Sequence, residues 1–284
     1  MLGIFQSPGA VIIDFGEIFN LGISLPLRWY GLLTGLGFLA ALLVIQRYLR
    51  SKITPEQENL VFDWALYSFL GGLLGARLWF VALNGAYFGE HPAEILAIWN
   101  GGQSIQGGFV GGILIAYLYF LIHKANLPRP GHYADAVGLG LPVAQAIGRW
   151  GNFFNNEAYG LPTDLPWGLY IPPEYRVREF LEERFFHPTF AYEFLYLMTV
   201  FGFLSLLVRF IHEGKVKLAP GGIFCLYLML YSFGRFWFEF LRLDSLMLWG
   251  FPAAQVICFL TLIGAGFFLW LLNFSTIMQG KTDI

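Results

Sequence analysis

The sequence predicts an all-α polytopic membrane protein with seven transmembrane helices and a small extracytoplasmic head. Of its 284 residues, 57% are hydrophobic and 13% are charged, and the mean hydropathy is +0.60. In soluble domains about a quarter of all residues are charged. Because one crossing of the hydrocarbon core takes roughly 20 residues, a chain of this length accommodates seven. We therefore expect residues 1–284 to form a single membrane-embedded domain.

Seven apolar segments are candidates for the spans. They cover residues 25–48, 60–83, 104–122, 133–147, 188–210, 220–241 and 249–274. The fourth is short and contains Pro142, so we expect it to be kinked, tilted or partly re-entrant. Near Met1 there is no positive charge, and Asp14 interrupts the apolar stretch. A cleavable secretory signal is therefore not expected.

The lysines predict the orientation. Each follows an odd-numbered span: Lys52, Lys124, Lys215, Lys217 and Lys281. Since positive residues collect in cytoplasmic loops, these ends are expected inside. The N-terminus is then outside, the C-terminus is inside, and the loops 84–100, 149–187 and 242–248 face outward.

The net charge and the cysteine positions argue against a nucleic-acid-binding protein and against a disulfide-rich one. A net charge of −2 provides no basic surface for a nucleic acid. Cys225 and Cys258 both lie in apolar runs, which favours buried small side chains over a disulfide framework.

Arginine alone supplies the basic residues of the outward or membrane-embedded side. The positions are Arg28, Arg77, Arg149, Arg176, Arg178, Arg184, Arg235 and Arg242. A planar guanidinium binds phosphate or carboxylate through two parallel hydrogen bonds. Any one of them could instead snorkel to the headgroups or pair with a carboxylate. As a group they indicate an anionic ligand.

Glycines recur in the spans, as in Gly71, Gly72 and Gly75 of the second and in 107–112 of the third. Small residues let membrane helices approach closely, so we interpret them as packing positions. They match no nucleotide-binding fingerprint.

Polar residues collect in the segment GRWGNFFNNEAYG, residues 148–160. An arginine and a glutamate there could neutralise each other, but three asparagines beside them favour a ligand site. A second group lies on one face of the sixth span, where the spacing i, i+4, i+8 and i+11 aligns Tyr231, Arg235, Glu239 and Arg242. These side chains are expected to face the interior of the bundle.

The outward third of the bundle is thus predicted to gather a set of ionisable residues: Tyr30, Arg77, Arg149, Glu157, Arg235 and Glu239, with Arg242 as a further candidate. Arginines in an apolar surrounding suit a phospholipid headgroup, and they would stabilise negative charge on a departing phosphate. The histidines are scattered and the sequence has no HExxH motif, so we expect no metal and no other cofactor. The sequence also lacks a GxSxG motif, so we do not expect a serine nucleophile of that type.

These motifs make the chain resemble the bacterial prolipoprotein diacylglyceryl transferases over nearly its whole length. The strongest element is GRWGNFFNNEAYG. Supporting motifs are RWYG at 28–31, the glycine run at 71–78, YADAVGLGLP at 133–142, HPTFAYE at 187–193 and GRFWFEFLR at 234–242. The resemblance implies a multi-pass protein of the bacterial inner (cytoplasmic) membrane.

The resemblance also implies a reaction that begins lipoprotein maturation. The diacylglyceryl group of phosphatidylglycerol passes to the lipobox cysteine thiol of a preprolipoprotein signal peptide, forming a thioether and releasing glycerol 1-phosphate. By the same resemblance Arg149 contacts the lipid phosphate, Asn152 and Glu157 shape that site, Arg235 assists the headgroup, and Glu239 orients Arg235. Tyr30 and Gly160 also fall on motif positions.

One position departs from the family. Where its members commonly have a histidine that could deprotonate the thiol, this chain has Gln106. Glutamine cannot act as a base, but a thiol is a few per cent ionised at neutral pH. Glu157, Glu239 and His187 remain alternatives as proton acceptor. A tolerated replacement in an active enzyme is favoured over a divergent lipid-binding paralogue.

Other acidic and histidine residues have structural interpretations. His187 and Pro188 are expected to begin the fifth span, and Glu193 to pair with an arginine or a tyrosine hydroxyl. Asp63 and Asp135 are expected to interact with helix N-termini.

Residues 155–186 form the predicted head, whose prolines favour turns and extended pieces. A transporter is a weaker alternative, because its polar residues should reach both surfaces.

Overall fold

The computed structural model describes residues 5–17, 24–97, 101–124, 130–243 and 245–282. These residues divide into two compact units, which we describe separately. The first comprises 1–15, 27–45 and 130–284, and the second comprises 16–26 and 46–129. The chain ends that define the predicted orientation, residues 1–4 and 283–284, lie outside the described part.

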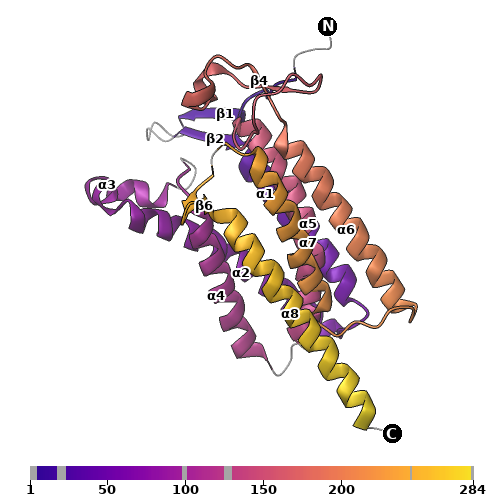
Figure 1. Ribbon diagram of the computed structural model, residues 1–284. Helices are drawn as coiled ribbons and strands as arrows, with labels where there is room; N and C mark the ends of the chain where they lie inside the picture. The colour runs from indigo at the N-terminus through magenta and orange to yellow at the C-terminus, as the bar shows by residue number, and fades with distance from the viewer. Residues whose placement is uncertain (1–4, 18–23, 98–100, 125–129, 244, 283–284) are drawn as a thin grey trace. The chain divides into compact units, whose positions relative to one another are not determined.

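Most of the described chain is helical. The long helices are α1 (Trp29–Leu49), α2 (Pro55–Leu83), α4 (Ile105–His123), α5 (Pro130–Asn155), α6 (Thr189–His212), α7 (Gly222–Phe238) and α8 (Ala253–Thr282) (Figure 1). The shorter helical elements are α3 (Gly85–Glu90), η1 (Pro92–Leu96), η3 (Pro173–Tyr175), η4 (Arg178–Phe180) and η5 (Glu239–Leu241). Three two-stranded sheets pair β1 (Val11–Glu17) with β2 (Ser24–Arg28), β3 (Leu169–Tyr170) with β4 (Phe185–Phe186), and β5 (Met247–Leu248) with β6 (Phe251–Pro252).

Within the described residues, six helices are long and apolar enough to cross a membrane: α1, α2, α4, α6, α7 with η5, and α8. They coincide with six of the seven predicted spans. The fourth predicted span, 133–147, lies inside α5, which is 26 residues long and continues through Pro142. The apolar stretch is therefore only the middle of a longer helix with polar residues toward its end. The chain is a polytopic membrane protein.

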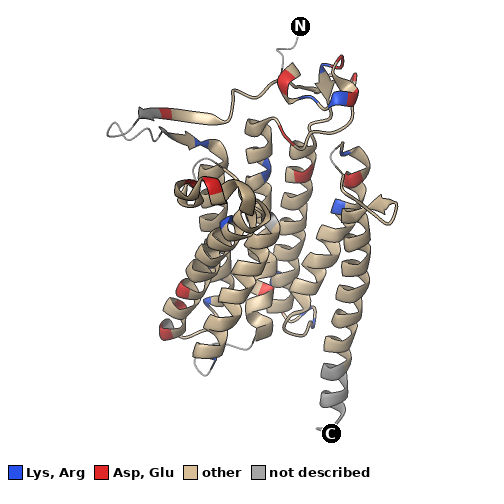
Figure 2. Cartoon of the chain, turned by 90° about the vertical axis from the view of Figure 1, so that its left-hand side faces the viewer, with Lys and Arg blue, Asp and Glu red and all other residues tan. Residues whose placement is uncertain are grey.

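Surface composition agrees with this class of protein. Large apolar side chains such as Leu43, Ile113 and Phe259 are more than half exposed, a surface that water would not favour but lipid tails would. Figure 2 shows long stretches of helix without charged residues, whereas charged residues gather in the segment that joins α5 to α6.

In the first unit, α5, α6 and α7 lie side by side and α8 packs along α7 (Figure 1). Asp135 of α5 accepts hydrogen bonds from the backbone N–H groups of Gly221, Ile223 and Phe224, at distances of 2.9–3.1 Å, and so caps the start of α7. The predicted interaction of Asp135 with a helix N-terminus is confirmed, but the helix is α7 and not its own. Because both helices begin at this contact, α5 and α7 run in the same direction.

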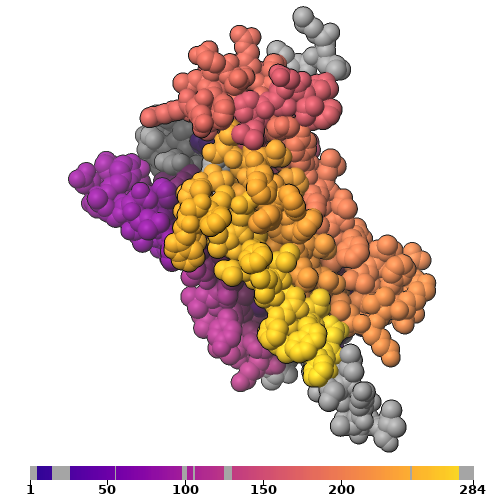
Figure 3. Space-filling view, in the orientation of Figure 1, coloured from indigo at the N-terminus to yellow at the C-terminus, as the bar shows by residue number. Residues whose placement is uncertain are grey.

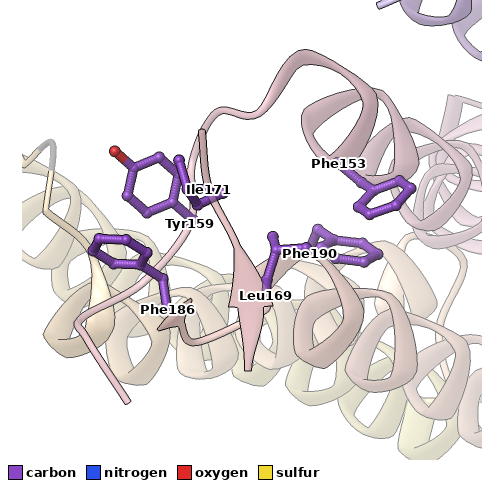
Figure 4. Close-up of a cluster of buried hydrophobic side chains, with 6 residues drawn as sticks. All are labelled: Phe153, Tyr159, Leu169, Ile171, Phe186 and Phe190. Atoms are coloured by element: carbon purple, nitrogen blue, oxygen red, sulfur yellow. The ribbon is translucent and has the colours of Figure 1, made fainter. Parts of the chain in front are cut away.

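The segment that joins α5 to α6 contains no long helix, in keeping with its prolines. In Figure 3 it lies at one end of the helices of its unit. Six buried side chains attach it to the ends of α5 and α6: Phe153, Tyr159, Leu169, Ile171, Phe186 and Phe190 (Figure 4). Arg176 donates to the carbonyl oxygens of Ile171 and Leu181, which gives this arginine a structural role.

The second unit is organised by close packing of α2 against α4. A Cβ atom built on Gly75 would lie 2.8 Å from the Cα of Gly111, and one on Gly111 would lie 2.9 Å from the Cα of Gly75. Real side chains do not approach so closely, so glycine is required on both helices. The interpretation of these glycines as packing positions is confirmed. Thr54 and Gln57 form a capping box that begins α2.

Candidate functional site

Two arginines of the first unit share one buried carboxylate. Arg149 of α5 forms an ion pair of 2.7 Å with Glu193 of α6. The other oxygen of Glu193 lies 4.0 Å from Arg242, which follows η5. The expectation that Glu193 pairs with an arginine is confirmed, and the alternative in which Arg149 and Glu157 neutralise each other does not match this geometry.

A second ion pair lies where α7 ends. Arg235 and Glu239 approach to 2.5 Å across one helical turn, and Ser245 donates to the other Glu239 oxygen at 2.7 Å. Arg235 and Glu239, which the helical spacing places on one face, therefore form an ion pair in the structure. Gly234, beside Arg235, lies against the ring of Tyr196, whose hydroxyl donates to the Leu230 carbonyl oxygen. These contacts hold α7 against α6.

Tyr231 lies near both ion pairs. It interacts electrostatically with Arg149, Arg235 and Glu193, and it lies one turn before Arg235 on α7. The two arginines that the sequence singled out therefore both lie near the Tyr231 side chain. We call Arg149, Glu193, Arg235, Glu239 and Arg242 the arginine cluster; its side chains come from α5, α6, and α7 with the segment that follows it.

The cluster has an excess of positive charge with partial access to the surroundings. It holds three arginines and two glutamates. The glutamate side chains are 5% and 2% exposed, whereas those of Arg149, Arg235 and Arg242 are 18%, 16% and 13% exposed. Buried carboxylates thus orient the guanidinium groups without covering them, as an anion-binding site requires.

The end of α5 presents a second polar group. Asn156 adopts a left-handed conformation with φ of 53°, and the N–H groups of Asn156 and Glu157 donate to the carbonyl oxygens of Phe153 and Asn152. This is a Schellman motif, which ends the helix. It turns Glu157 back, so that its carboxylate accepts from the amides of Asn152 and Asn155 at 3.0 and 3.3 Å.

Tyr30 of α1 stands beside this turn. Its ring packs so closely on α5 that a Cβ atom at Gly151 would lie 2.7 Å from it. The hydroxyl interacts electrostatically with both Glu157 and Arg149. The structure therefore brings Tyr30, Arg149, Asn152 and Glu157 together, as the sequence predicts.

Gly160 has a packing role. A Cβ atom there would lie 2.9 Å from both the Cβ of His187 and the Cγ2 of Thr189. Gly160 forms an isolated antiparallel bridge with Arg242, and the Leu161 N–H donates to the carbonyl oxygen of Leu241. Gly160 thus allows the start of the head to lie against the segment that carries Arg242.

Arg77 and Gln106 belong to the second unit. All five Arg77 N–H groups find carbonyl oxygens, those of Glu94, Ile95, Ala97, Gly101 and Gly102. This arginine is 7% exposed and organises the segment around η1. Gln106 is exposed in the first turn of α4, where its side-chain oxygen accepts from Ser104 at 2.7 Å.

Sequence reasoning left two residues out of the site. Glu193 was expected to be paired, but its connection to both Arg149 and Arg242 depends on how α5, α6 and the end of α7 meet. Ser245 lies in a loop and gave no signal. His187, expected at the start of a helix, accepts or donates at Nδ1 with the Tyr192 hydroxyl at 3.2 Å.

Fold and site together define a polytopic membrane protein with a buried, cation-rich cluster between its helices. Comparison with known proteins identifies the family. The model of the family described as prolipoprotein diacylglyceryl transferase matches residues 17–271. The chain therefore belongs to the prolipoprotein diacylglyceryl transferase family.

Individual relatives are similar over most of their length, and each carries the name phosphatidylglycerol–prolipoprotein diacylglyceryl transferase. The protein of Fervidobacterium nodosum is 44% identical over 94% of this chain and 87% of its own. That of a Nostoc species is 41% identical over 89% and 86%. That of Thermosynechococcus vestitus is 39% identical over 99% and 97%.

Proposed function

We propose that the arginine cluster holds the phosphate of phosphatidylglycerol while its diacylglyceryl group is transferred. The chain is a transferase that moves this group to the cysteine thiol of a prolipoprotein, with a thioether and glycerol 1-phosphate as products. The observation that carries the site assignment is the cluster itself, in which three partly accessible arginines are oriented by two buried glutamates.

The cluster suits the bond changes of this reaction. The cysteine sulfur forms a bond to the terminal glycerol carbon, the carbon–oxygen bond to the phosphate breaks, and its electron pair leaves with the phosphate. Negative charge therefore grows on the phosphate in the transition state. Guanidinium groups fixed beforehand stabilise that charge without reorganising. Arg149 and Arg235 contact the phosphate, while Glu193 and Glu239 position them.

The thiol proton needs an acceptor other than Gln106. Glu193 and Glu239 are both paired with arginines, whereas Glu157 is exposed and is contacted by two amides. Glu157 is therefore the carboxylate best suited to accept the proton. Tyr30, beside Glu157 and Arg149, borders the place where thiol and lipid would meet.

The membrane arrangement follows from the same proposal. The enzyme lies in the bacterial inner membrane, with α5 as the seventh crossing and with the N-terminus and the head of residues 155–186 outside. The lysine-bearing ends and the C-terminus are inside. The head and the arginine cluster then face the leaflet from which phosphatidylglycerol and the preprolipoprotein signal peptide approach.

A reconstituted transfer assay tests the function. The purified protein is mixed with phosphatidylglycerol and a lipobox peptide, and glycerol phosphate release is followed. We expect Arg149→Ala to lower kcat by roughly 10²–10³-fold, the effect of removing one transition-state donor. Gln106→His should retain or increase the rate.

Two results of this assay would contradict the proposal. A parental rate in Arg149→Ala would exclude the phosphate role of this arginine. An inactive parent that gains activity through Gln106→His would favour the alternative, a divergent paralogue that binds lipid without efficient transfer.

A further inference from the structure

A polar pair lies one helical turn away from the arginine cluster, toward the middle of the helices. Gln145 precedes Arg149 by four residues on α5, and Tyr227 precedes Tyr231 by four residues on α7. The Tyr227 hydroxyl donates to the side-chain oxygen of Gln145 at 3.1 Å. Because α5 and α7 run in the same direction, the pair forms the next layer below Arg149 and Tyr231.

The arrangement leaves hydrogen-bond donors of Gln145 unused. Tyr227 is 3% exposed and Gln145 is half-buried. The hydroxyl occupies the amide oxygen, and in the described part of the chain the amide nitrogen of Gln145 has no acceptor. Polar groups at membrane depth are costly, and they usually mark a ligand pathway or a partner across the bundle.

Tyr227 also determines which face the amide presents. A glutamine side chain carries one acceptor and two donors. The hydroxyl engages the oxygen of Gln145 and leaves both of its N–H groups available to a ligand. A ligand atom that binds these donors must accept hydrogen bonds without donating any. It would lie beside the arginine cluster, toward the middle of the helices.

We infer that Gln145, held by Tyr227, donates to an ester carbonyl of the bound glycerophospholipid. This inference rests on the proposed function. A diacyl lipid whose phosphate lies at Arg149 and Arg235 carries its two ester carbonyls on the acyl-chain side of that phosphate, and an ester carbonyl accepts but never donates. The pair thereby recognises the diacylglyceryl group, whereas the arginine cluster recognises the phosphate.

Paired lipid substrates test this inference. Phosphatidylglycerol with ester-linked chains is compared with its diether analogue, which has the same headgroup and chain length but no carbonyls. The KM and kcat of each are measured for the full-length enzyme with a lipobox peptide. One hydrogen bond to a neutral acceptor is worth a factor of roughly five in KM. We expect the parent to favour the ester lipid by about this factor and Gln145→Leu to have nearly equal KM values for both.

The ratio of the two KM values is taken for each variant, and comparing this ratio between variants cancels the intrinsic difference between the two lipids. Thr199→Val is the matched control, because among the described residues the Thr199 hydroxyl bonds only to the Leu195 carbonyl oxygen of its own helix. The ratio of this variant should equal that of the parent. Should Gln145→Leu not fold, Tyr227→Phe takes its place, since it frees the amide while keeping the ring, and its ratio should fall by at least half.

The outcomes separate the two proposals. An ester preference that persists unchanged in Gln145→Leu or Tyr227→Phe overturns the inference, as does a parent that does not distinguish the lipids. In both cases transfer itself is observed and the proposed function stands. A parent without transfer activity on either lipid contradicts the proposed function instead.

Discussion

Glu193 is the residue on which the geometry of the cluster depends most. It is 4% exposed and faces two arginines. Removing one member of a buried ion pair leaves a charge without compensation, which typically costs 3–5 kcal/mol. Glu193→Gln should therefore lower the free energy of unfolding by about 3 kcal/mol, measured by thermal or denaturant unfolding in detergent.

Glu182→Gln is the control for this variant, because Glu182 is exposed in the head. Surface changes of this type lie within about 0.5 kcal/mol. Equal stability of both variants would show that Glu193 does not compensate Arg149.

The residue scale also shows what the sequence could provide. Helical spacing placed Arg235 and Glu239 on one face, and the ion pair between them agrees with that placement. The partner of Arg149 required the contact of α5 with α6, which the periodicity of either helix does not contain. Arg77 had the same composition signal as Arg149, yet backbone carbonyls satisfy it. Only the folded positions of residues 94–97 and 101–102 distinguish the two.

The element scale is governed by the contact of α2 with α4. A Cβ atom on Gly75 would meet backbone atoms of α4 below 3 Å, while one on Gly72, a turn away, would lie at an ordinary 3.4 Å from the Gly108 carbonyl oxygen. Overpacking a tight interface costs about 1–3 kcal/mol. Gly75→Ala should destabilise the protein by this amount, and Gly72→Ala should not.

Melting temperatures of the two variants measure this difference. They share one helix and one chemical change, so propensity cancels between them. Equal melting temperatures would contradict the close approach of the two helices.

The glycine pattern predicted this packing correctly, whereas the length of α5 was underestimated because its apolar core ends before the polar turn at Asn155.

At the scale of the whole molecule, the prediction concerns orientation. Cys225 and Cys258 are both buried, so a single exposed cysteine can be labelled above a low background. In spheroplasts an impermeant maleimide should label Glu179→Cys of the head. Lys217→Cys, beyond α6, should be labelled only after permeabilisation. The reverse pattern would place the arginine cluster near the inner leaflet and contradict the proposed arrangement.

The number of membrane spans shows how much of the topology can be predicted from amino-acid composition alone. Six helices follow from hydropathy because each is long and apolar enough to cross a membrane. The proposed seventh crossing, α5, carries Asp135, Gln145 and Arg149, each with a partner on another helix. Its polar residues are compensated by contacts that appear only after folding, so the helix most important for the site has the weakest hydropathy signal.

The most direct test of the phosphate role is a binding measurement without chemistry. Affinities of the full-length protein for phosphatidylglycerol and for diacylglycerol, which lacks the phosphate, are compared in the parent and in Arg149→Ala by competition with a fluorescent lipid. The parent should prefer phosphatidylglycerol, and Arg149→Ala should lose at least about tenfold of that preference, the value of one charged hydrogen bond. A preference of the same size in both proteins would contradict a phosphate site at the arginine cluster.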